Sequence, residues 1–145
     1  MYTTEGIILK KTDAGEAGAL FTLYTRDFGK IRALAQGIKR EGAKLKGHLE
    51  PLNLCRIGFV LGKNGERLTY AEMLNSWRGI RESLGKLEAA LEAAALVDER
   101  CFPGEKDEGL WQMLLGHLRK IENEEKMDKD VPQFFAKQLF EYLSI

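Results

Sequence analysis

The spacing of the apolar residues changes near residue 80, and this change is the feature that most limits the possible folds. Before it, apolar and polar residues tend to alternate, as in Lys30-Ile31-Arg32-Ala33, which is the period of a strand with one buried face. After it, apolar residues recur every three or four positions, which is the period of an amphipathic helix. A chain of 145 residues is enough for one domain, or for one small domain with a helical appendage. We therefore expect strands followed by helices.

Five strands are expected before the change, over residues 5–11, 19–26, 30–36, 52–62 and 67–77. Asp27-Phe28-Gly29 provides a turn between the second and third, and Asn64-Gly65 is a favoured pair for the hairpin between the last two. Residues 43–50 are typical of a short helix or loop that ends at Pro51. Five strands with one short helical insertion predict a small, partly open barrel of the OB type.

Three helices are expected after the change. Their apolar positions are, in order, Ile80, Leu84, Leu87, Leu91, Ala94 and Val97; then Leu110, Trp111, Leu114, Leu118 and Ile121; then Phe134, Phe135, Leu139, Phe140 and Leu143. Phe102-Pro103-Gly104 stops the first helix. The predicted fold class is α+β, with a five-stranded OB-fold barrel over residues 1–80 and a small acidic α-helical domain over residues 81–145.

The charge changes sign at almost the same place. The chain has 22 basic and 22 acidic residues, so its formal net charge is zero. Residues 1–81 hold 14 Lys and Arg against 8 Asp and Glu, a net of +6, whereas residues 82–145 hold 8 against 14, a net of −6. Such asymmetry between halves is typical of a chain with a nucleic-acid surface on one side only.

The sequence gives little indication of catalysis, metal binding or membrane insertion. Cys55 and Cys101 lie far apart and indicate two buried, reduced thiols, and surface or capping roles are expected for His48 and His117. No nucleophile, acid and base set stands out. The densest apolar run, Ala89–Val97, is too short to span a membrane, and no leader peptide is recognisable. We expect a cytoplasmic binding protein with no enzymatic activity, no cofactor and no metal.

Basic residues gather in residues 26–46, where seven Lys and Arg face only Asp27 and Glu41. Three more lie on neighbouring strands. This excess is greater than solubility needs and indicates phosphate binding. The ten candidates are Arg26, Lys30, Arg32, Lys39, Arg40, Lys44, Lys46, Arg56, Lys63 and Arg67.

Four aromatic residues lie near this cluster in sequence: Tyr24, Phe28, Phe59 and Tyr70. Grooves that bind single strands combine a cationic track with aromatic side chains on which bases stack. Small barrels also need large side chains in their core. Both interpretations stay open, and we favour the core.

Several segments resemble the bacterial recombination mediator family RecO. They are Thr4-Glu5-Gly6-Ile7-Ile8-Leu9, Gly15-Glu16-Ala17, residues 20–26 and 28–37, Leu49-Glu50-Pro51-Leu52 and Leu68-Thr69-Tyr70-Ala71-Glu72. Together they cover most of residues 4–81 in the family's order. The resemblance implies an N-terminal OB-fold domain followed by a helical domain.

The resemblance also implies a function. Proteins of this family bind single- and double-stranded DNA, anneal complementary strands, and act with RecR and single-strand-binding protein to load RecA. The ten basic residues would then be DNA-binding residues that neutralise backbone phosphates, with no catalytic role. The protein would lie in the cytoplasm, associated with the bacterial nucleoid.

Family members are usually longer and often carry a four-cysteine zinc motif. Residues 134–143 resemble the helix just before that motif, and the sequence stops at Ile145. The expected protein is therefore a short or truncated form without the zinc module, and a contact with single-strand-binding protein is left unassigned. Apolar surface around Phe134 and Phe140 is expected to be exposed and available for a dimer or a partner.

Two other functions stay open. One is a protein-interaction adaptor that does not bind DNA directly, in which the barrel and the acidic helices each hold a protein. The other is an RNA-binding OB protein. An enzyme is the class with least support.

Overall fold

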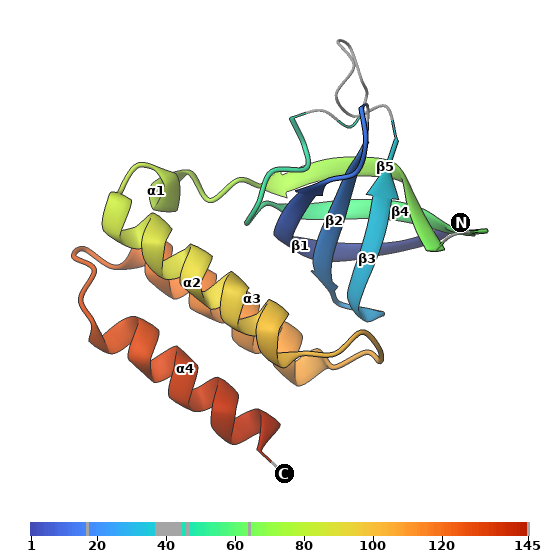
Figure 1. The fold of residues 1–145 in the computed structure, drawn as a ribbon. Helices are drawn as coiled ribbons and strands as arrows, with labels where there is room; N and C mark the ends of the chain where they lie inside the picture. Colours follow the sequence, from blue (N-terminus) through green and yellow to red (C-terminus); the bar gives the residue numbers. More distant parts are fainter. Residues whose placement is uncertain (17, 37–44, 46, 64, 145) are drawn as a thin grey trace.

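The computed structural model describes residues 1–16, 18–36, 45, 47–63 and 65–144. Five strands form a closed barrel, and four helices follow it in the sequence. Figure 1 shows the helices gathered beside the barrel, with the N-terminus at the end of the barrel far from them. The predicted fold class, a five-stranded barrel of the OB type followed by a helical portion, is confirmed.

The strands are β1 (Tyr2–Asp13), β2 (Ala19–Thr25), β3 (Gly29–Ala35), β4 (Leu54–Gly62) and β5 (Gly65–Asn75). Their order around the barrel is β1-β2-β3-β5-β4, and β4 pairs with β1 again. Neighbouring strands are antiparallel except β3 and β5, which are parallel and pair only at Ala33 with Glu66 and Leu34 with Arg67. Most of β3 therefore lies beside β5 without ladder pairing.

The long strand β1 belongs to both sides of the barrel. Its first residues, from Tyr2, pair with β4, and its second half pairs with β2 up to Asp13. The register with β2 shifts between Ile8 and Lys10, and such bulges bend a strand. The predicted strand over residues 5–11 was right in kind but too short at both ends.

The interior of the barrel is filled by side chains from alternate positions of every strand. Buried members include Ile8, Phe21, Leu23, Ile57 and Phe59. In β3 the buried residues Ile31, Ala33 and Ala35 alternate with less buried Arg32 and Leu34, as the sequence pattern predicts. Where a short helix or loop was expected, over residues 43–50, the described residues (45 and 47–50) form turns and irregular backbone; residues 43, 44 and 46 lie outside the described residues.

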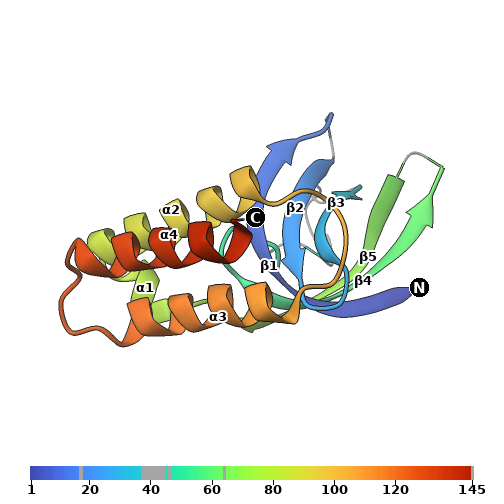
Figure 2. The ribbon, with the colours of Figure 1, turned by 90° about the horizontal axis from the view of Figure 1, so that it is seen from below.

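The helices are α1 (Arg78–Arg81), α2 (Leu84–Arg100), α3 (Glu108–Asn123) and α4 (Asp130–Leu143). Figure 2 shows α2, α3 and α4 lying side by side next to the barrel. The predicted single helix from residue 80 is wrong at its start, because the chain breaks after α1 and Ser83 caps a new helix by accepting a hydrogen bond from the Lys86 amide. The strand predicted to reach residue 77 ends at Asn75, and Trp77 precedes α1 with a left-handed φ of 56°.

The buried face of α2 differs in part from the predicted one. Leu84 is 74% exposed and Leu91 is 42% exposed, although both were placed on the apolar stripe. The rest of the predicted stripe is confirmed, since Ile80, Ala94 and Val97 are buried and Leu87 packs against the same cluster. The small side chains Ala89, Ala90 and Ala93 are buried beside them. Since α2 packs against β1, α3 and α4, small residues allow their backbones to approach closely, and leucines are left at the margin.

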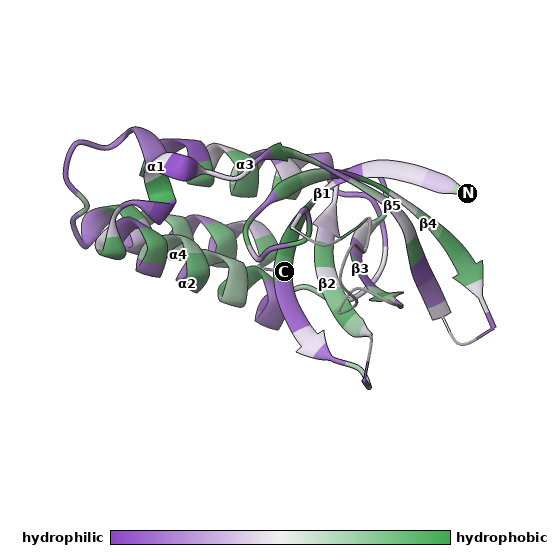
Figure 3. Ribbon diagram, turned by 90° about the horizontal axis from the view of Figure 1, so that it is seen from above, coloured by the Kyte–Doolittle hydropathy of each residue, from purple (hydrophilic) through white to green (hydrophobic). Residues whose placement is uncertain are grey.

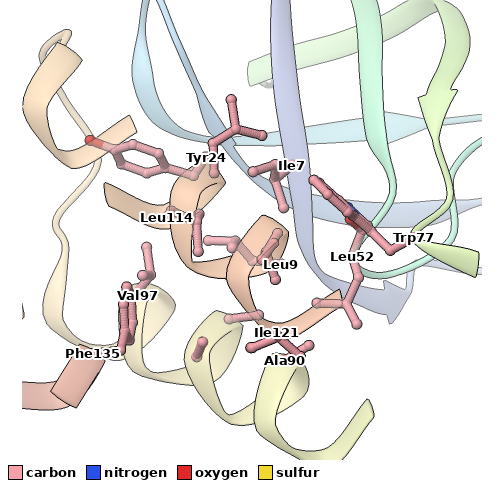
Figure 4. Close-up of a cluster of buried hydrophobic side chains, with 14 of the residues drawn as sticks. Ile7, Leu9, Tyr24, Leu52, Trp77, Ala90, Val97, Leu114, Ile121 and Phe135 are labelled. Atoms are coloured by element: carbon pink, nitrogen blue, oxygen red, sulfur yellow. The ribbon is translucent and has the colours of Figure 1, made fainter. Parts of the chain in front are cut away.

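A second hydrophobic cluster joins the helices to the outside of the barrel. It contains Ile7, Leu9 and Tyr24 from β1 and β2, and helical residues such as Leu114 and Phe135. Figure 4 shows these side chains meeting between the strands and the helices, with Trp77 and Leu52 at one edge. Because both portions contribute to this cluster, they are packed as one body; the division into domains at residues 80 and 81 stays a prediction.

The last helix leaves two large apolar side chains at the surface, as the sequence predicts. Phe134 is 59% exposed and Phe140 is 42% exposed. A cation lies over each ring: Lys120 Nζ is 5.5 Å from the Phe134 centroid, and the Arg100 guanidinium carbon is 4.8 Å from the Phe140 centroid. Each ring is therefore partly covered by a neighbouring helix.

Among the described residues, none of the helices combines the length and the apolar character that spanning a membrane requires.

The expected surface or capping role of His117 is wrong. Its imidazole is buried in α3 and stacks on Phe135 with ring centroids 4.1 Å apart, and its Nε2 atom has no hydrogen-bond partner among the described residues. Burial, with the nearby charge of Lys120, lowers the pKa of His117 to about 4. The imidazole is therefore neutral in the folded protein near pH 7.

The stability of the protein should fall in acid in a way that depends on His117. Below pH 6.5 the unfolded chain binds a proton at this residue, whereas the folded chain does so only near pH 4, so the free energy of unfolding falls between these values by roughly 2–3 kcal/mol. In His117→Phe this contribution is absent. Urea unfolding at several pH values measures the free energy of unfolding of both proteins. As the pH falls, that of the parent protein should decrease more than that of the variant. A difference that does not change with pH would contradict a buried neutral imidazole.

Candidate nucleic-acid interface

The predicted site residues that the structure describes line three adjoining hollows on the barrel. We call them the aromatic groove, between Tyr2, Arg32 and Pro103; the polar hollow, between Thr3, Arg26 and Arg56; and the hairpin hollow, between Leu34, Lys63 and Arg67. The aromatic groove shares Asp27 and Lys106 with the polar hollow, and Glu66 with the hairpin hollow. Neighbouring hollows therefore adjoin at shared residues, and we call the three together the track.

The aromatic groove has a volume of about 720 Å³. Tyr2, Phe28 and Phe59 form a cluster on its barrel side: Tyr2 stacks on Phe59 at 5.4 Å between centroids, and Phe28 meets the two rings edge-on at 5.6 and 5.3 Å. Such stacked and edge-on geometries are the favourable ones for aromatic pairs. Phe59 is only 3% exposed, whereas Tyr2 is 46% exposed, so Tyr2 is the ring that a ligand can reach.

The segment 103–106, between α2 and α3, makes the opposite side of this groove. Figure 1 shows this segment reaching the end of β3 next to the β2–β3 turn. Pro103 forms an isolated bridge with Lys30, and Gly29, with a φ of +65°, lies directly against the backbone of Gly104 and Glu105. The groove is thus built where the helical portion touches the barrel.

The polar hollow holds three cations in ion pairs at the surface. Arg26 Nη2 lies 2.8 Å from Glu108 Oε1, and Lys106 Nζ lies 3.7 Å from Asp27 Oδ1. Arg56 Nη1 lies 3.4 Å from Glu72 Oε2. The hydrogen bond from Arg26 lowers the pKa of the Glu108 carboxyl group. These side chains are largely solvated, and exposed ion pairs stabilise a fold only weakly, so a phosphate can replace the carboxylates at small cost.

The hairpin hollow holds Lys63 and Arg67 next to the turn between β4 and β5. Both are exposed, as is Arg32 in the neighbouring aromatic groove. Figure 3 shows hydrophilic ribbon over the first residues of β5 beside hydrophobic ribbon at the adjacent end of β4. Polar and apolar surface therefore meet along this edge of the track.

Lys30 differs from the other candidates because its ammonium group is used within the fold. Nζ lies 2.8 Å from the Asp98 carboxylate and donates to the backbone carbonyls of Asp98 at 2.6 Å and Cys101 at 3.1 Å. Its side chain is 12% exposed. Cations near the carbonyl end of a helix are stabilising, and here Lys30 holds the end of α2 to the barrel.

Four of the ten predicted residues, Lys39, Arg40, Lys44 and Lys46, lie outside the described residues. The other six each line one of the three hollows. Their role in binding DNA stays a prediction.

The aromatic residues are divided between the two interpretations. Tyr24 and Phe59 are buried, which confirms the core interpretation for them. Tyr70 is 43% exposed, and its hydroxyl donates to Glu72 Oε2 at 2.9 Å, so the core interpretation is wrong there. Two residues of the track, Tyr2 and Lys106, were missed. Tyr2 carried a weak signal, since it is an aromatic residue at the start of an alternating segment.

The remaining reactive side chains are few in the part of the chain that the structure describes. His48 Nδ1 accepts a hydrogen bond from the Met73 amide at 3.1 Å. Burial raises the pKa of the Cys55 thiol to about 12, and Cys101 is partly buried. Within the described ranges, no group of three or more His, Cys, Asp or Glu side chains is placed to hold a metal ion.

Comparison with known proteins identifies the family. The family model that describes the N-terminal region of recombination protein O matches residues 1–77 of the chain. Proteins named "DNA repair protein RecO" are similar to the chain: that of Gloeothece citriformis is 33% identical over 99% of the chain and 50% of its own length. The protein of Gloeobacter violaceus is 32% identical over 83% of the chain and 46% of its own length. The protein of Rubrobacter xylanophilus is 32% identical over 87% of the chain and 50% of its own length.

These relatives match across both the barrel and the helical portion, although the chain spans about half of their length. The family model covers the whole barrel, from β1 to the end of β5. The chain therefore belongs to the RecO family.

Proposed function

We propose that the chain is a DNA repair protein that binds the backbone of single- and double-stranded DNA along the track and brings complementary strands together. One observation carries this proposal: six basic residues predicted from the sequence to contact phosphates line three hollows that share residues. The proposal also rests on the family, whose relatives are named as DNA repair proteins. It assigns a binding role rather than catalysis.

Binding of this kind would be independent of base sequence. Arg and Lys side chains neutralise phosphates and release counterions, so the affinity for DNA falls steeply with salt. Annealing follows from the same chemistry, because two strands that are each partly neutralised repel one another less. Apart from segment 103–106, which lines the track, the acidic helical portion, with its net charge of −6 over residues 82–145, would stay away from the phosphates.

We further propose that the bound DNA is passed to a recombinase, with RecR and single-strand-binding protein as partners and RecA as the protein that is loaded. The support is the family resemblance and the helical surface that the track leaves free. Action on chromosomal DNA would place the protein at the bacterial nucleoid.

The triple variant Arg32→Ala/Lys63→Ala/Arg67→Ala tests the track. These three residues are exposed. With about six phosphate contacts, the logarithm of the duplex affinity should fall with the logarithm of salt at a slope near −5; three lost contacts should reduce this slope by about 2 to 3 and the affinity at least about tenfold. Fluorescence anisotropy titrations over a salt series measure both.

The matched control is Lys126→Ala/Lys129→Ala/Lys137→Ala, which removes the same charge from exposed positions of the helical portion. It should bind DNA as the parent protein does. Equal losses in the two triple variants would mean that net charge, not the track, governs binding. The same titration on Lys39→Ala/Arg40→Ala/Lys44→Ala/Lys46→Ala tests the four candidates outside the described residues.

Three other outcomes would redirect the proposal. DNA affinity that does not change with salt would exclude a phosphate-binding track. Tighter binding of an RNA strand than of a DNA strand with the same base sequence would favour the RNA-binding alternative. Absence of DNA binding by the parent protein, together with capture of partner proteins after nuclease treatment, would favour the adaptor.

A further inference from the structure

We propose that the aromatic groove is a base-stacking subsite for single-stranded DNA, in which one unpaired base packs on Tyr2 while the phosphates on either side lie in the polar and hairpin hollows. This inference rests on the proposed function and adds to it a place where a base, not a phosphate, is bound. The three steps of the argument are the charge of the groove, the accessibility of its rings and the order of the hollows.

The groove suits a neutral, flat group better than a phosphate. Three cations line it, Lys30, Arg32 and Lys106, but so do three acids, Asp27, Glu66 and Glu105. Lys30 is already held by Asp98, and Lys106 by Asp27. With its charges balanced and partly used, the groove attracts a phosphate weakly. Its apolar lining consists of the aromatic rings together with Ile31 and Leu61 and, on the opposite side, Pro103.

The size and rigidity of the groove also fit a base. Ligand sites are commonly concave spaces of roughly 300–1,000 Å³, and about 720 Å³ leaves room for a nucleobase and its sugar. Tyr2 presents nearly half of its surface and is held from behind by Phe28 and Phe59. A ring fixed in this way loses little conformational entropy when a base stacks on it.

The order of the hollows places cations on both sides of the aromatic rings. Cations come first in the polar hollow (Arg26 and Arg56), the aromatic rings follow, and cations return in the hairpin hollow (Lys63 and Arg67). This is the combination of charge and stacking surface found in sites for single strands. Bases in a duplex are paired and stacked inside, so only an unpaired strand can use the groove. We therefore infer that the subsite adds affinity for single strands that a duplex cannot gain.

Tyr70 provides a matched control. It is exposed to nearly the same extent as Tyr2, 43% against 46%, and it lies in β5 on the barrel surface. It lines none of the three hollows, and its hydroxyl is bound to Glu72. The variants are Tyr2→Leu, which keeps an apolar side chain without a flat ring, Tyr2→Phe, which keeps the ring, and Tyr70→Leu.

The experiment measures the affinity of each folded variant for an oligothymidylate strand and for a duplex of the same length. Tyr2→Leu should bind the single strand about tenfold more weakly and the duplex unchanged, while Tyr2→Phe and Tyr70→Leu bind both as the parent protein does. In a second measurement, an oligothymidylate with one 5-iodouracil is irradiated on the parent protein, and mass spectrometry should place the cross-link on Tyr2 or Phe28.

The results separate this inference from the proposed function. Two results would exclude the base-stacking subsite in a parent protein that binds DNA: normal binding of single strands by Tyr2→Leu, or cross-links that fall only outside the groove. Neither result would contradict the proposed binding of phosphates along the track. Equal weakening for single strand and duplex also overturns it, because that result indicates a change in the track as a whole. If the parent protein binds no DNA, the proposed function itself fails.

Discussion

Replacing Gly29 by alanine should lower the free energy of unfolding by about 3 kcal/mol or more. Gly29 has a φ of +65°, a conformation that costs an L-amino acid roughly 1–2 kcal/mol. A β-carbon there would also lie 2.5 Å from the Glu105 carbonyl oxygen and 2.9 Å from that of Gly104. Both contacts are with backbone, so the segment 103–106 must move away from the β2–β3 turn, and the strain adds to the conformational cost.

Two other glycines separate the conformational cost from the collision. Gly65 also has a positive φ, +113°, but a β-carbon there meets nothing within 4 Å, so Gly65→Ala should cost only the conformational penalty, about 1–3 kcal/mol. A β-carbon on Gly104 likewise meets nothing, and Gly104→Ala should be nearly neutral. Urea unfolding of the three variants measures these differences. A cost for Gly29→Ala no greater than that for Gly65→Ala would show that the close packing against segment 103–106 is unimportant.

The barrel was predictable because its signals are local. Alternation in segments such as residues 30–36 fixes which face is buried, and a hairpin pair fixes where β4 turns into β5. The ends of the strands were less predictable, because pairing partners decide them. Tyr2 is in a strand because it pairs with Phe59, and no pattern around Tyr2 reveals that partner.

The helical portion shows how packing overrides periodicity. Leu84 and Leu91 have the spacing of a buried stripe, yet they are exposed because the neighbouring alanines let α2 approach β1 closely. Trp77 has the β-propensity of a strand residue, yet burial in the cluster between barrel and helices places it before α1. In both cases the contact surface of another element, distant in sequence, decides the outcome.

The candidate site was predictable in its charge and not in its geometry. A count of basic residues selects Arg26 and Lys30 along with Arg32, but it does not reveal that Glu108 and Asp98 pair with the first two. Those acids come from the helical portion. The aromatic groove itself could not be found in the sequence, since Tyr2 and Lys106 meet there only after the chain folds.

Replacing Trp77 by alanine should lower the free energy of unfolding by about 4 kcal/mol. Trp77 is 1% exposed, and its Nε1 donates a hydrogen bond to the Leu52 carbonyl at 2.8 Å. Truncation removes a large buried ring, which typically costs 3–5 kcal/mol. It also leaves the Leu52 carbonyl without this donor, in a segment where Leu52 itself has a φ of 77°. Figure 4 shows that both residues belong to the contact between barrel and helices.

The variant Trp77→Phe distinguishes the two effects, because it keeps much of the ring but no donor, and about 2 kcal/mol should be lost. Both variants should still unfold in a single transition, since Ile7, Leu9 and Tyr24 of the barrel share one buried cluster with the helices. Circular dichroism and the fluorescence of the remaining Trp111 should therefore report the same midpoint in urea. Two separate midpoints, with the fluorescence of Trp111 changing first, would mean that the barrel folds without the helices and that Trp77 is the main link between them.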